Sequence, residues 1–331
     1  MAAAHAVTID EAVQRLRAGG VVAFPTETVY GLGADALNEE AVGRVYQLKG
    51  RPPQNPLIVH VDGAEMARRF VAAWPGRAQR LADRFWPGPL TMVLEKSPVV
   101  PALVTGGGPT VAMRCPDHPV ALALIRAFGG PIVGPSANPS GRVSPTTPDH
   151  VRENLAGADV LLLDGGQCRA GIESTVLSLA HGAANVLRPG LVTREQIAAA
   201  LDEPVGEGAL ERIPGAPFAS PGMMERHYAP RAPAVLFPRD QWPEVIGHAA
   251  GPVVVLTHEP SRRAGSGVRI IRMPTEPGLY AARLYSALHE ADALHPALVA
   301  IERPEGIGGV WDAIRDRLQR AAATAPRAAT T

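Results

Sequence analysis

Short apolar runs alternate with segments of helical period through the first part of the chain. The runs are bounded by Gly, Pro, Asn or Ser, and strands are predicted over 21–24, 56–61, 89–95, 110–114, 131–137, 158–164, 174–179 and 185–190. Helices are predicted near 10–18, 64–73, 77–85, 117–127, 148–155 and 193–201. A further helix should run from its N-cap Asn38 through Leu48 and stop at Gly50. This mixture predicts an α/β domain with a mixed, twisted sheet.

The composition changes after residue 203, where a Pro-rich stretch has neither a helical nor an alternating period. Beyond it, strands over 234–238, 251–258, 268–274 and 297–304 alternate with helices near 240–249, 278–293 and 309–323. That alternation predicts a small Rossmann-like domain with a parallel sheet. We therefore expect a first domain over 1–203, a linker or lid over 204–233, a second domain over 234–323 and a disordered tail over 324–331.

Composition narrows the class of protein. The chain has 331 residues, with 32 basic residues against 32 acidic ones, which argues against a dedicated nucleic-acid coat or a polybasic membrane binder. A hydrophobic content of 46% excludes a disordered chain. Two cysteines cannot build a disulfide framework or a four-thiolate zinc site. Neither a signal peptide nor a membrane span is visible, so we expect a cytoplasmic protein without membrane contact.

A basic segment carries the first candidate chemistry. Lys49 and Arg51 stand two residues apart after a predicted helix. In an extended segment, residues at this spacing share a face, so both cations could meet one phosphate group. They are expected to face solvent when no ligand is bound. The alternative is that Lys49 only complements the dipole at the helix C-terminus, which leaves Arg51, Asn55 and His60 unexplained.

Several polar segments follow predicted strands. FPTETVYGLGAD (24–35) reads as a strand that leads into a hydroxyl-rich loop, and GPSANPSGRVSPT (134–146) offers N–H and O–H donors for an anion or a nucleotide. Ordinary turn chemistry would give a similar composition. Arg114 ends an apolar strand, where an arginine is usually a surface residue. GIGG (306–309) could seat an anion, although a Gly-rich connection is the favoured interpretation.

In their order along the chain, these segments resemble the YrdC/Sua-type threonylcarbamoyl-AMP synthases in their long, two-domain form. The motifs are FPTETVYGLG, LKGRP followed by NPLIVH, FWPGPLT, TVAMRCPDH, PSANPSG, IEST and LRPG, with SPGMMERHYAP in the linker. The resemblance covers nearly the whole chain. It implies a YrdC-like twisted mixed sheet with helices, followed by a small Rossmann-like parallel C-terminal domain.

The resemblance also implies an activity. Such nucleotidyltransferases form L-threonylcarbamoyladenylate and pyrophosphate from L-threonine, bicarbonate or CO2, and ATP. The product then passes to a tRNA threonylcarbamoyltransferase complex, which modifies an adenosine beside the anticodon, and a weak RNA contact is conceivable. Mg²⁺ is expected to accompany ATP, whereas no protein metal ligand is assigned. The linker is expected to cover the labile intermediates.

The residue roles follow from the matching motif positions. Lys49 and Arg51 are the expected catalytic residues, because phosphoryl chemistry needs positive charge opposite the developing negative oxygens. The expected ATP contacts are Lys49, Arg51, Asn55, Thr110, Ser136, Asn138, Ser144, Arg188, Arg226 and Tyr228. The expected threonine contacts are Thr28, His60, Arg114 and Ser174. One departure from the family pattern is Met224 with Glu225, where a basic and an aromatic residue are usual.

Two other functions stay open at this point. A double-stranded RNA-binding module could use the same basic loop, and balanced charge does not exclude a reader of duplex shape. A carbamoyltransferase that uses carbamoyl phosphate is the other candidate, because the YrdC fold also occurs in hydrogenase-maturation proteins. Those proteins carry Cys-rich modules, and the two cysteines of this chain argue against that function.

Overall fold

The computed structural model describes residues 7–180, 182–208, 226–242, 249, 251–258 and 266–323. The chain forms two compact units. The first unit comprises Met1–Ser140 and Ser144–Met223, and the second comprises Gly141–Val143 and Met224–Thr331. Gly141–Val143 belong to the second unit because the Ala229 N–H donates to the Gly141 carbonyl. No helix among the described residues is long and apolar enough to cross a membrane.

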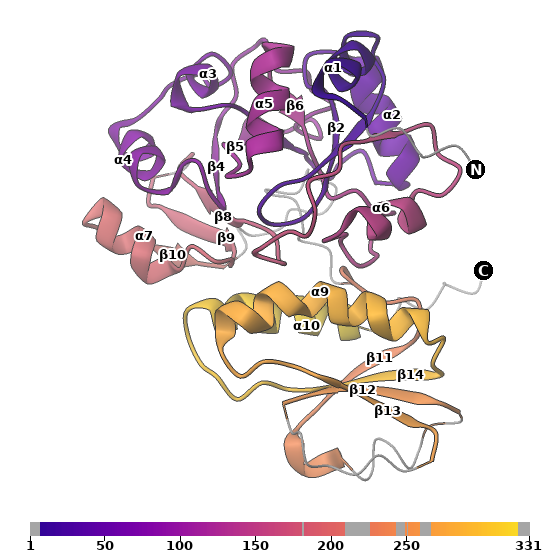
Figure 1. Cartoon of the computed structure of the whole chain (residues 1–331). Coiled ribbons are helices and arrows are strands. Elements are labelled where there is room, and N and C mark those ends of the chain that lie inside the picture. Colours follow the sequence, from indigo (N-terminus) through magenta and orange to yellow (C-terminus); the bar gives the residue numbers. More distant parts are fainter. Residues whose placement is uncertain are drawn as a thin grey trace, which may run out of the picture. The chain divides into compact units, whose positions relative to one another are not determined.

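The first unit is built on one ten-stranded sheet (Figure 1). Its strand order is β10-β9-β8-β4-β5-β3-β6-β2-β1-β7. The strands are β1 (Val22–Phe24), β2 (Gly31–Asp35), β3 (Ile58–His60), β4 (Leu90–Glu95), β5 (Thr110–Arg114), β6 (Ile132–Val133), β7 (Leu161–Leu162), β8 (Thr175–Ser178), β9 (Asn185–Arg188) and β10 (Gly206–Glu207). The sheet contains both parallel pairs, such as β3 with β5, and antiparallel ones, such as β4 with β5. The predicted mixed sheet is thus confirmed.

The helices of the first unit are α1 (Ile9–Arg17), α2 (Glu39–Lys49), α3 (Ala64–Arg68), α4 (Gly76–Phe85), α5 (Pro119–Phe128), α6 (Pro148–Asn154) and α7 (Arg194–Leu201). The start and stop of α2 are confirmed. The Asn38 side chain accepts bonds from two backbone N–H groups, and Gly50 ends the helix with a φ of 57°. α3 is shorter than the predicted 64–73, because Ala72 donates instead to the Glu95 carbonyl at the end of β4.

One interior strand was missed by the sequence pattern. Residues 24–35 were expected to form a strand and then a loop, but Gly31–Asp35 return as β2 and pair with both β1 and β6. A Cβ atom at Gly31 or Gly33 would lie 2.9 or 3.0 Å from the Phe24 ring. Glycine leaves room for that ring. Because glycine is a weak strand former, the same residues concealed the strand from sequence analysis.

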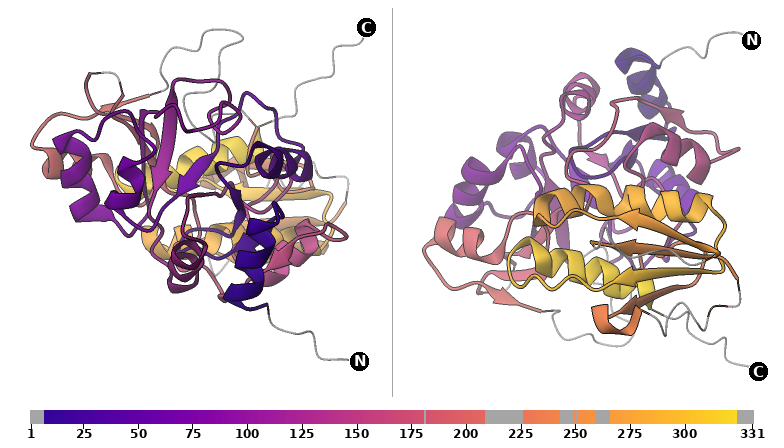
Figure 2. Two further views of the ribbon diagram at one scale, coloured as in Figure 1. Left: turned by 90° about the horizontal axis from the view of Figure 1, so that it is seen from above. Right: turned by 60° about the horizontal axis from the view of Figure 1, so that its bottom comes forward.

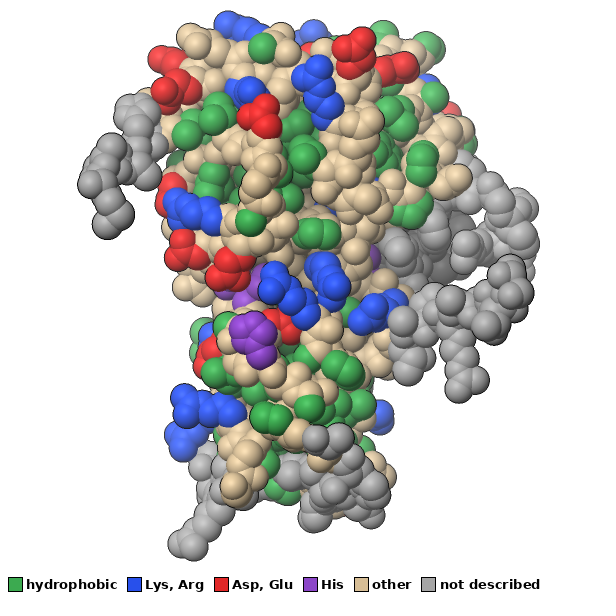
Figure 3. Space-filling view, turned by 90° about the vertical axis from the view of Figure 1, so that its right-hand side faces the viewer, with side chains coloured by type: hydrophobic (Ala, Val, Ile, Leu, Met, Phe, Trp, Pro, Cys, Tyr) green, Lys and Arg blue, Asp and Glu red, His purple; other side chains and the backbone are tan. Residues whose placement is uncertain are grey.

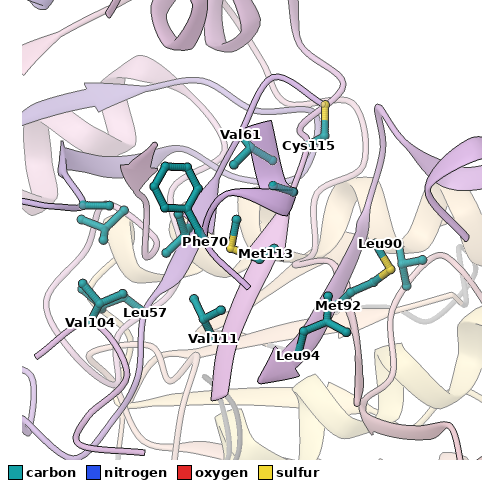
Figure 4. Close-up of a cluster of buried hydrophobic side chains, with 14 of the residues drawn as sticks. Leu57, Val61, Phe70, Leu90, Met92, Leu94, Val104, Val111, Met113 and Cys115 are labelled. Carbon is teal, nitrogen blue, oxygen red and sulfur yellow. The ribbon is translucent and has the colours of Figure 1, made fainter. Parts of the chain in front are cut away.

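The core of the first unit lies against this sheet. Figure 4 shows Val111 and Met113 of β5 and Met92 and Leu94 of β4 within one apolar cluster, together with Phe70. These side chains are almost fully buried. Alternate positions of the two strands therefore pack on one face, as the period of two requires.

The second unit is a four-stranded parallel sheet in the order β11-β14-β12-β13. Its elements are β11 (Ala234–Phe237), η1 (Arg239–Gln241), β12 (Val253–Thr257), β13 (Val268–Arg272), α9 (Pro277–Ala293), β14 (Leu298–Glu302) and α10 (Val310–Ala322). α9 and α10 lie side by side over one face of the sheet (Figures 1 and 2). The all-parallel sheet confirms the predicted Rossmann-like domain.

Two predicted segments meet the limits of the described residues. The linker predicted over 204–233 opens with a strand, because Gly206–Glu207 pair in parallel with Asn185–Val186. Residues 209–225 of that linker lie outside the described residues, as do 243–248 of the helix predicted near 240–249, whose described start is η1. The tail predicted over 324–331 lies outside them too. The predicted domain boundaries and the lid therefore stay predictions.

Candidate functional site

Lys49 is the last residue of α2, and its side chain is buried. Its Nζ donates to the carbonyls of Ser136, at 2.5 Å, and Asn138, at 2.6 Å. Burial, and then the charge of Arg51, hold the Lys49 pKa well below its usual value, while Glu173 acts in the opposite direction. The expectation of a solvent-facing lysine is wrong, because only 3% of its surface is exposed.

Arg51 is also buried, against expectation, and it is held by its own loop. Its Nε donates to the Asn55 carbonyl at 3.0 Å, and its Nη2 donates to Asn55 Oδ1 and the Pro56 carbonyl, each at 2.8 Å. Gly50 is left-handed, so the segment from Lys49 to Arg51 is not the extended one that was predicted. Arg51 lies close enough to Lys49 for its charge to lower the Lys49 pKa, but the two side chains donate to different carbonyl groups.

The 134–146 loop joins the basic segment to the rest of the sheet. Besides the two carbonyls on Lys49 Nζ, the Ser140 N–H donates to the Lys49 carbonyl at 2.7 Å. Ser144 Oγ donates to Glu173 Oε1 at 2.6 Å. The structure therefore brings together the predicted ATP contacts Lys49, Ser136, Asn138 and Ser144. It adds Glu173, which sequence analysis did not single out, although it stands inside the IEST motif.

Arg114 lies at the end of β5 and forms a buried ion pair. Its Nη2 is 2.8 Å from Glu27 Oε1, and both side chains are at most 4% exposed. The expectation of a surface arginine from its strand position is therefore wrong. Glu27 was missed by sequence analysis. The available signal was an acidic residue between two threonines, directly after a buried strand.

His60 stands beside Arg114, because the parallel pairing of β3 with β5 sets the two residues opposite each other. Burial, followed by the charge of Arg114, lowers the His60 pKa well below its usual value, which favours the neutral ring. A Cβ atom at Gly134 would lie only 2.7 Å from His60 Nδ1. The 134–146 loop therefore passes directly over the histidine ring.

Several polar atoms of this region are buried without a hydrogen-bond partner among the described residues. They are both carboxylate oxygens of Glu27, Nη2 of Arg114, Nδ1 of His60 and Nδ2 of Asn55. Glu27 Oε1 and Arg114 Nη2 are close enough to form an ion pair, although neither atom has a hydrogen-bond partner among the described residues. Because buried polar groups are nearly always bonded, this cluster has the donors and acceptors of a ligand site.

The hydroxyl residues lie at the edge of the same cluster. Thr28 Oγ1 and Thr26 Oγ1 are 2.8 Å apart, and Ser174 Oγ is 2.8 Å from Thr91 Oγ1. Arg188 donates from Nε and Nη2 to the Ser174 carbonyl, at 3.1 and 3.0 Å. Arg188, a predicted ATP contact, thus positions Ser174, a predicted contact of the substrate threonine.

Other predicted contacts lie elsewhere. Thr110 begins β5 and is separated from Arg114 by the length of that strand. Arg226 and Tyr228 belong to the second unit. There the buried Tyr228 ring stacks on Tyr285 at 5.6 Å, with the Arg317 guanidinium 5.3 Å from its centre. That Thr110, Arg226 and Tyr228 contact ATP stays a prediction.

No group of three or more His, Cys, Asp or Glu side chains that could hold a metal lies among the described residues. The expected Mg²⁺ stays a prediction; an ion of this kind is usually bound by one or two carboxylates together with substrate phosphates. Glu173 is the carboxylate that acts on the Lys49 charge. It is therefore the residue that could hold the ion from the protein side.

Two family models match the chain. The model described as "Telomere recombination" covers residues 14–190, and the model described as "Threonylcarbamoyl-AMP synthase, C-terminal domain" covers residues 192–323. A threonylcarbamoyl-AMP synthase of Bacillus subtilis is 40% identical over 95% of this chain and 92% of its own length. One of Pyrococcus abyssi is 47% identical over 68% of this chain and 67% of its own length.

A solved structure leads to the same family. The crystal structure of Pyrococcus abyssi Sua5 complexed with L-threonine has a TM-score of 0.83 at 37% identity, over 95% of this chain and 94% of its own. These matches confirm the predicted two-domain form. Together with the convergence of the predicted motifs in the first unit, they show that the chain belongs to the threonylcarbamoyl-AMP synthase family.

Proposed function

We propose that this protein forms L-threonylcarbamoyladenylate and pyrophosphate from L-threonine, bicarbonate or CO2, and ATP. One observation carries the proposal. A buried cluster of polar atoms without hydrogen-bond partners among the described residues surrounds Arg114 and His60, beside the 134–146 loop. Lys49 Nζ donates to two carbonyls of that loop, and Arg51 follows two residues later, held by bonds to residues 55–56. The first unit thus offers sites for an amino acid and a triphosphate together.

The threonine end of the site is assigned to Arg114, Glu27 and His60. The guanidinium of Arg114 matches a carboxylate in shape and charge. The carboxylate oxygens of Glu27 have no hydrogen-bond partner among the described residues, so they can accept from the amine or carbamate N–H. His60, neutral through its lowered pKa, can bond the substrate without adding a charge. The oxygen of Ser174 or Thr28 can meet the threonine hydroxyl.

The phosphate end is assigned to Lys49 and Arg51. The threonine amine first adds to CO2 and loses a proton, which gives a carbamate. A carbamate oxygen then attacks the α-phosphorus of ATP, and the bond to pyrophosphate breaks. Such a displacement needs positioning and positive charge more than covalent participation by the protein. Mg²⁺, when bound, would neutralise charge on the leaving phosphates.

Lys49 has a further property that suits this task. Its burial disfavours the charged form while the site holds no anion. Phosphate oxygens near Nζ would reverse that preference, because an opposite charge favours the protonated amine. ATP binding should therefore raise the Lys49 pKa back towards its usual value. The completed product would then be passed to a tRNA-modifying transferase complex, and a cytoplasmic location stays a prediction.

The direct test is pyrophosphate release from ATP, with threonine and bicarbonate omitted in turn. Release should require both. Equal release without threonine would contradict the proposal and indicate a nonspecific ATPase, and release that requires carbamoyl phosphate would indicate the carbamoyltransferase. A duplex RNA module would bind RNA with a steep salt dependence and show no ATP chemistry. On the face of the first unit in Figure 3, acidic and basic side chains are interspersed, which does not favour that module.

A further inference from the structure

A cavity in the first unit is lined by residues outside the loops of the candidate site. Its volume is about 440 Å³, which is within the range of small-molecule pockets. The lining residues that matter here are Arg15, Gly20, Val21, Arg44, Leu48 and Asp159. They come from the end of α1, the turn after it, the outer part of α2 and the segment before β7. None of them is among the predicted contacts for ATP or threonine.

A glycine turn builds the basic wall of this cavity. Arg44 Nη1 donates to the Gly19 carbonyl at 2.5 Å. A Cβ atom at Gly20 would lie 2.4 Å from Cδ and Nε of Arg15, so the arginine stem runs directly across this glycine. Gly19 has a φ of 73°, which glycine adopts without strain. The Gly19 carbonyl thus binds Arg44, and the missing side chain of Gly20 leaves room for the Arg15 stem.

Arg15 is held by a carboxylate that is itself exposed. Its Nη2 donates to the Asp159 carbonyl at 2.9 Å and forms an ion pair with the Asp159 carboxylate. Nε of Arg15 is buried without a hydrogen-bond partner among the described residues. The Asp159 side chain is 89% exposed. A carboxylate so close to water can yield its place to a ligand at little cost, since exposed ion pairs stabilise weakly.

Charge and shape together select one kind of ligand. The two arginines and Asp159 leave a formal charge of one positive unit on the lining. Val21 and Leu48 supply aliphatic surface beside it. A monoanion matches this charge and can form charge-assisted bonds with the guanidinium groups, whereas a dianion would exceed the charge and a neutral ligand could not form such bonds.

We propose that this cavity binds a small monocarboxylate with a short aliphatic chain. The carboxylate meets the guanidinium groups of Arg44 and Arg15, and the chain lies against Val21 and Leu48. Leu48 immediately precedes Lys49 on α2, and Val21 immediately precedes β1, which leads to the 26–28 segment. The cavity is therefore a separate site that adjoins the elements of the candidate active site, and it does not depend on the function proposed above.

The test is a methyl NMR titration of the full chain, labelled at Ile, Leu and Val, with sodium hexanoate. The Leu48 and Val21 methyl signals should shift and saturate in the millimolar range. Hexan-1-ol has the same chain without the charge, and it should bind at least about tenfold more weakly, because it lacks the charge-assisted bonds. Sodium chloride at equal ionic strength should not shift these signals. Equal binding of hexanoate and hexanol, or shifts that do not saturate, would overturn the proposal.

Variants make the test specific. Arg44→Gln and Arg15→Gln should each weaken hexanoate binding about tenfold, as the loss of a charged partner predicts. Asp159→Asn removes the competing carboxylate and should tighten binding severalfold. Arg17→Gln is the matched control, because Arg17 donates to the Ala127 carbonyl and does not line the cavity. Should Arg15→Gln fail to fold, the other two variants decide: unchanged affinity in both Arg44→Gln and Asp159→Asn would overturn the site.

Discussion

The two units of the chain differ in how closely they group their buried polar side chains. In the first unit, buried polar side chains lie on loops or at the ends of helices and strands; they are Lys49, Arg51, Arg114, Glu27 and His60. In the described part of the second unit, the strands are mostly apolar. Buried polar groups occur there too: Thr257 Oγ1 donates to Glu302 on the neighbouring strand β14, and Nδ1 of His258 is buried without a hydrogen-bond partner among the described residues.

The difference indicates where the chemistry lies. Burial of a charge is costly unless the charge is paired and bonded. A fold that keeps several such groups together, with partnerless atoms between them, is organised around a ligand and not only around its core. The second unit consists of a parallel sheet with α9 and α10 packed over one face.

The largest effect is expected from Lys49→Met, which keeps the length of the side chain but removes its charge. We expect kcat/KM for pyrophosphate release to fall about 10²–10³-fold, as for loss of one preorganised electrostatic donor. Arg51→Met should behave similarly. Lys96→Met is the matched control, because Lys96 Nζ donates to the Val100 carbonyl at 3.0 Å and was not assigned to the site. Near-normal kcat/KM in Lys49→Met would remove Lys49 from the phosphate site.

The next effect concerns stability. Glu27→Gln leaves the buried Arg114 without its counter-charge, and we expect a loss of about 3 kcal/mol in the free energy of unfolding. Glu290→Gln breaks the exposed pair of Glu290 with Arg283 in the second unit, and it should cost less than about 1 kcal/mol. Urea denaturation measures both. If the two variants lost equal stability, the contrast between the units would not hold.

A smaller effect is expected from pH. The pKa values of His60 and His150 are lowered by burial, that of His150 to about 4. Below pH ~6.5 the unfolded chain binds protons at these histidines that the folded chain does not, so stability should fall as pH falls. Each group contributes at most about 1.4 kcal/mol per pH unit.

His60→Gln should flatten that dependence, whereas His295→Gln, at an exposed position of the second unit, should leave it unchanged. Unfolding free energies measured by urea between pH 7 and pH 5 distinguish the two variants. A slope that stays the same in His60→Gln would show that this histidine does not remain neutral in the folded protein.

The smallest effect is expected at the two thiols. Cys115 and Cys168 are buried, and burial raises the pKa of each to about 12. Because the thiolate is the reactive form, iodoacetamide should leave both unmodified in the folded protein while activity is retained. Mass spectrometry after alkylation gives the count. Rapid modification of either thiol at neutral pH would contradict the burial of these groups.

The sequence predicted the elements better than the side-chain environments. The caps of α2, the apolar period of β4 and β5 and the alternation in the second unit are local signals, and the structure confirms them. β2 was missed because its glycines leave room for the Phe24 ring, and this tertiary contact is not visible in the local sequence. The burial of Lys49 and Arg51 depends on carbonyl groups brought by the 134–146 loop and by residues 55–56, and spacing alone does not reveal such partners.

Glu27 illustrates the same limit. Its partner Arg114 is far away in the sequence. The pair forms because the segment after β1 lies next to the end of β5 in the folded chain. The motifs nevertheless located the segments that converge. Lys49, Ser136, Asn138, Ser144, His60, Arg114 and Ser174 were all chosen from their motifs, and the contacts described above link them within one unit.

The most direct test of the shared site is a crystal structure of the full chain with L-threonine and α,β-methylene-ATP, in which the bond to be broken is replaced by a stable one. The threonine carboxylate should lie on Arg114 and its amine beside Glu27, with the phosphates within hydrogen-bond distance of Lys49 or Arg51. Threonine or triphosphate bound outside the first unit, or phosphates remote from both cations, would contradict the account.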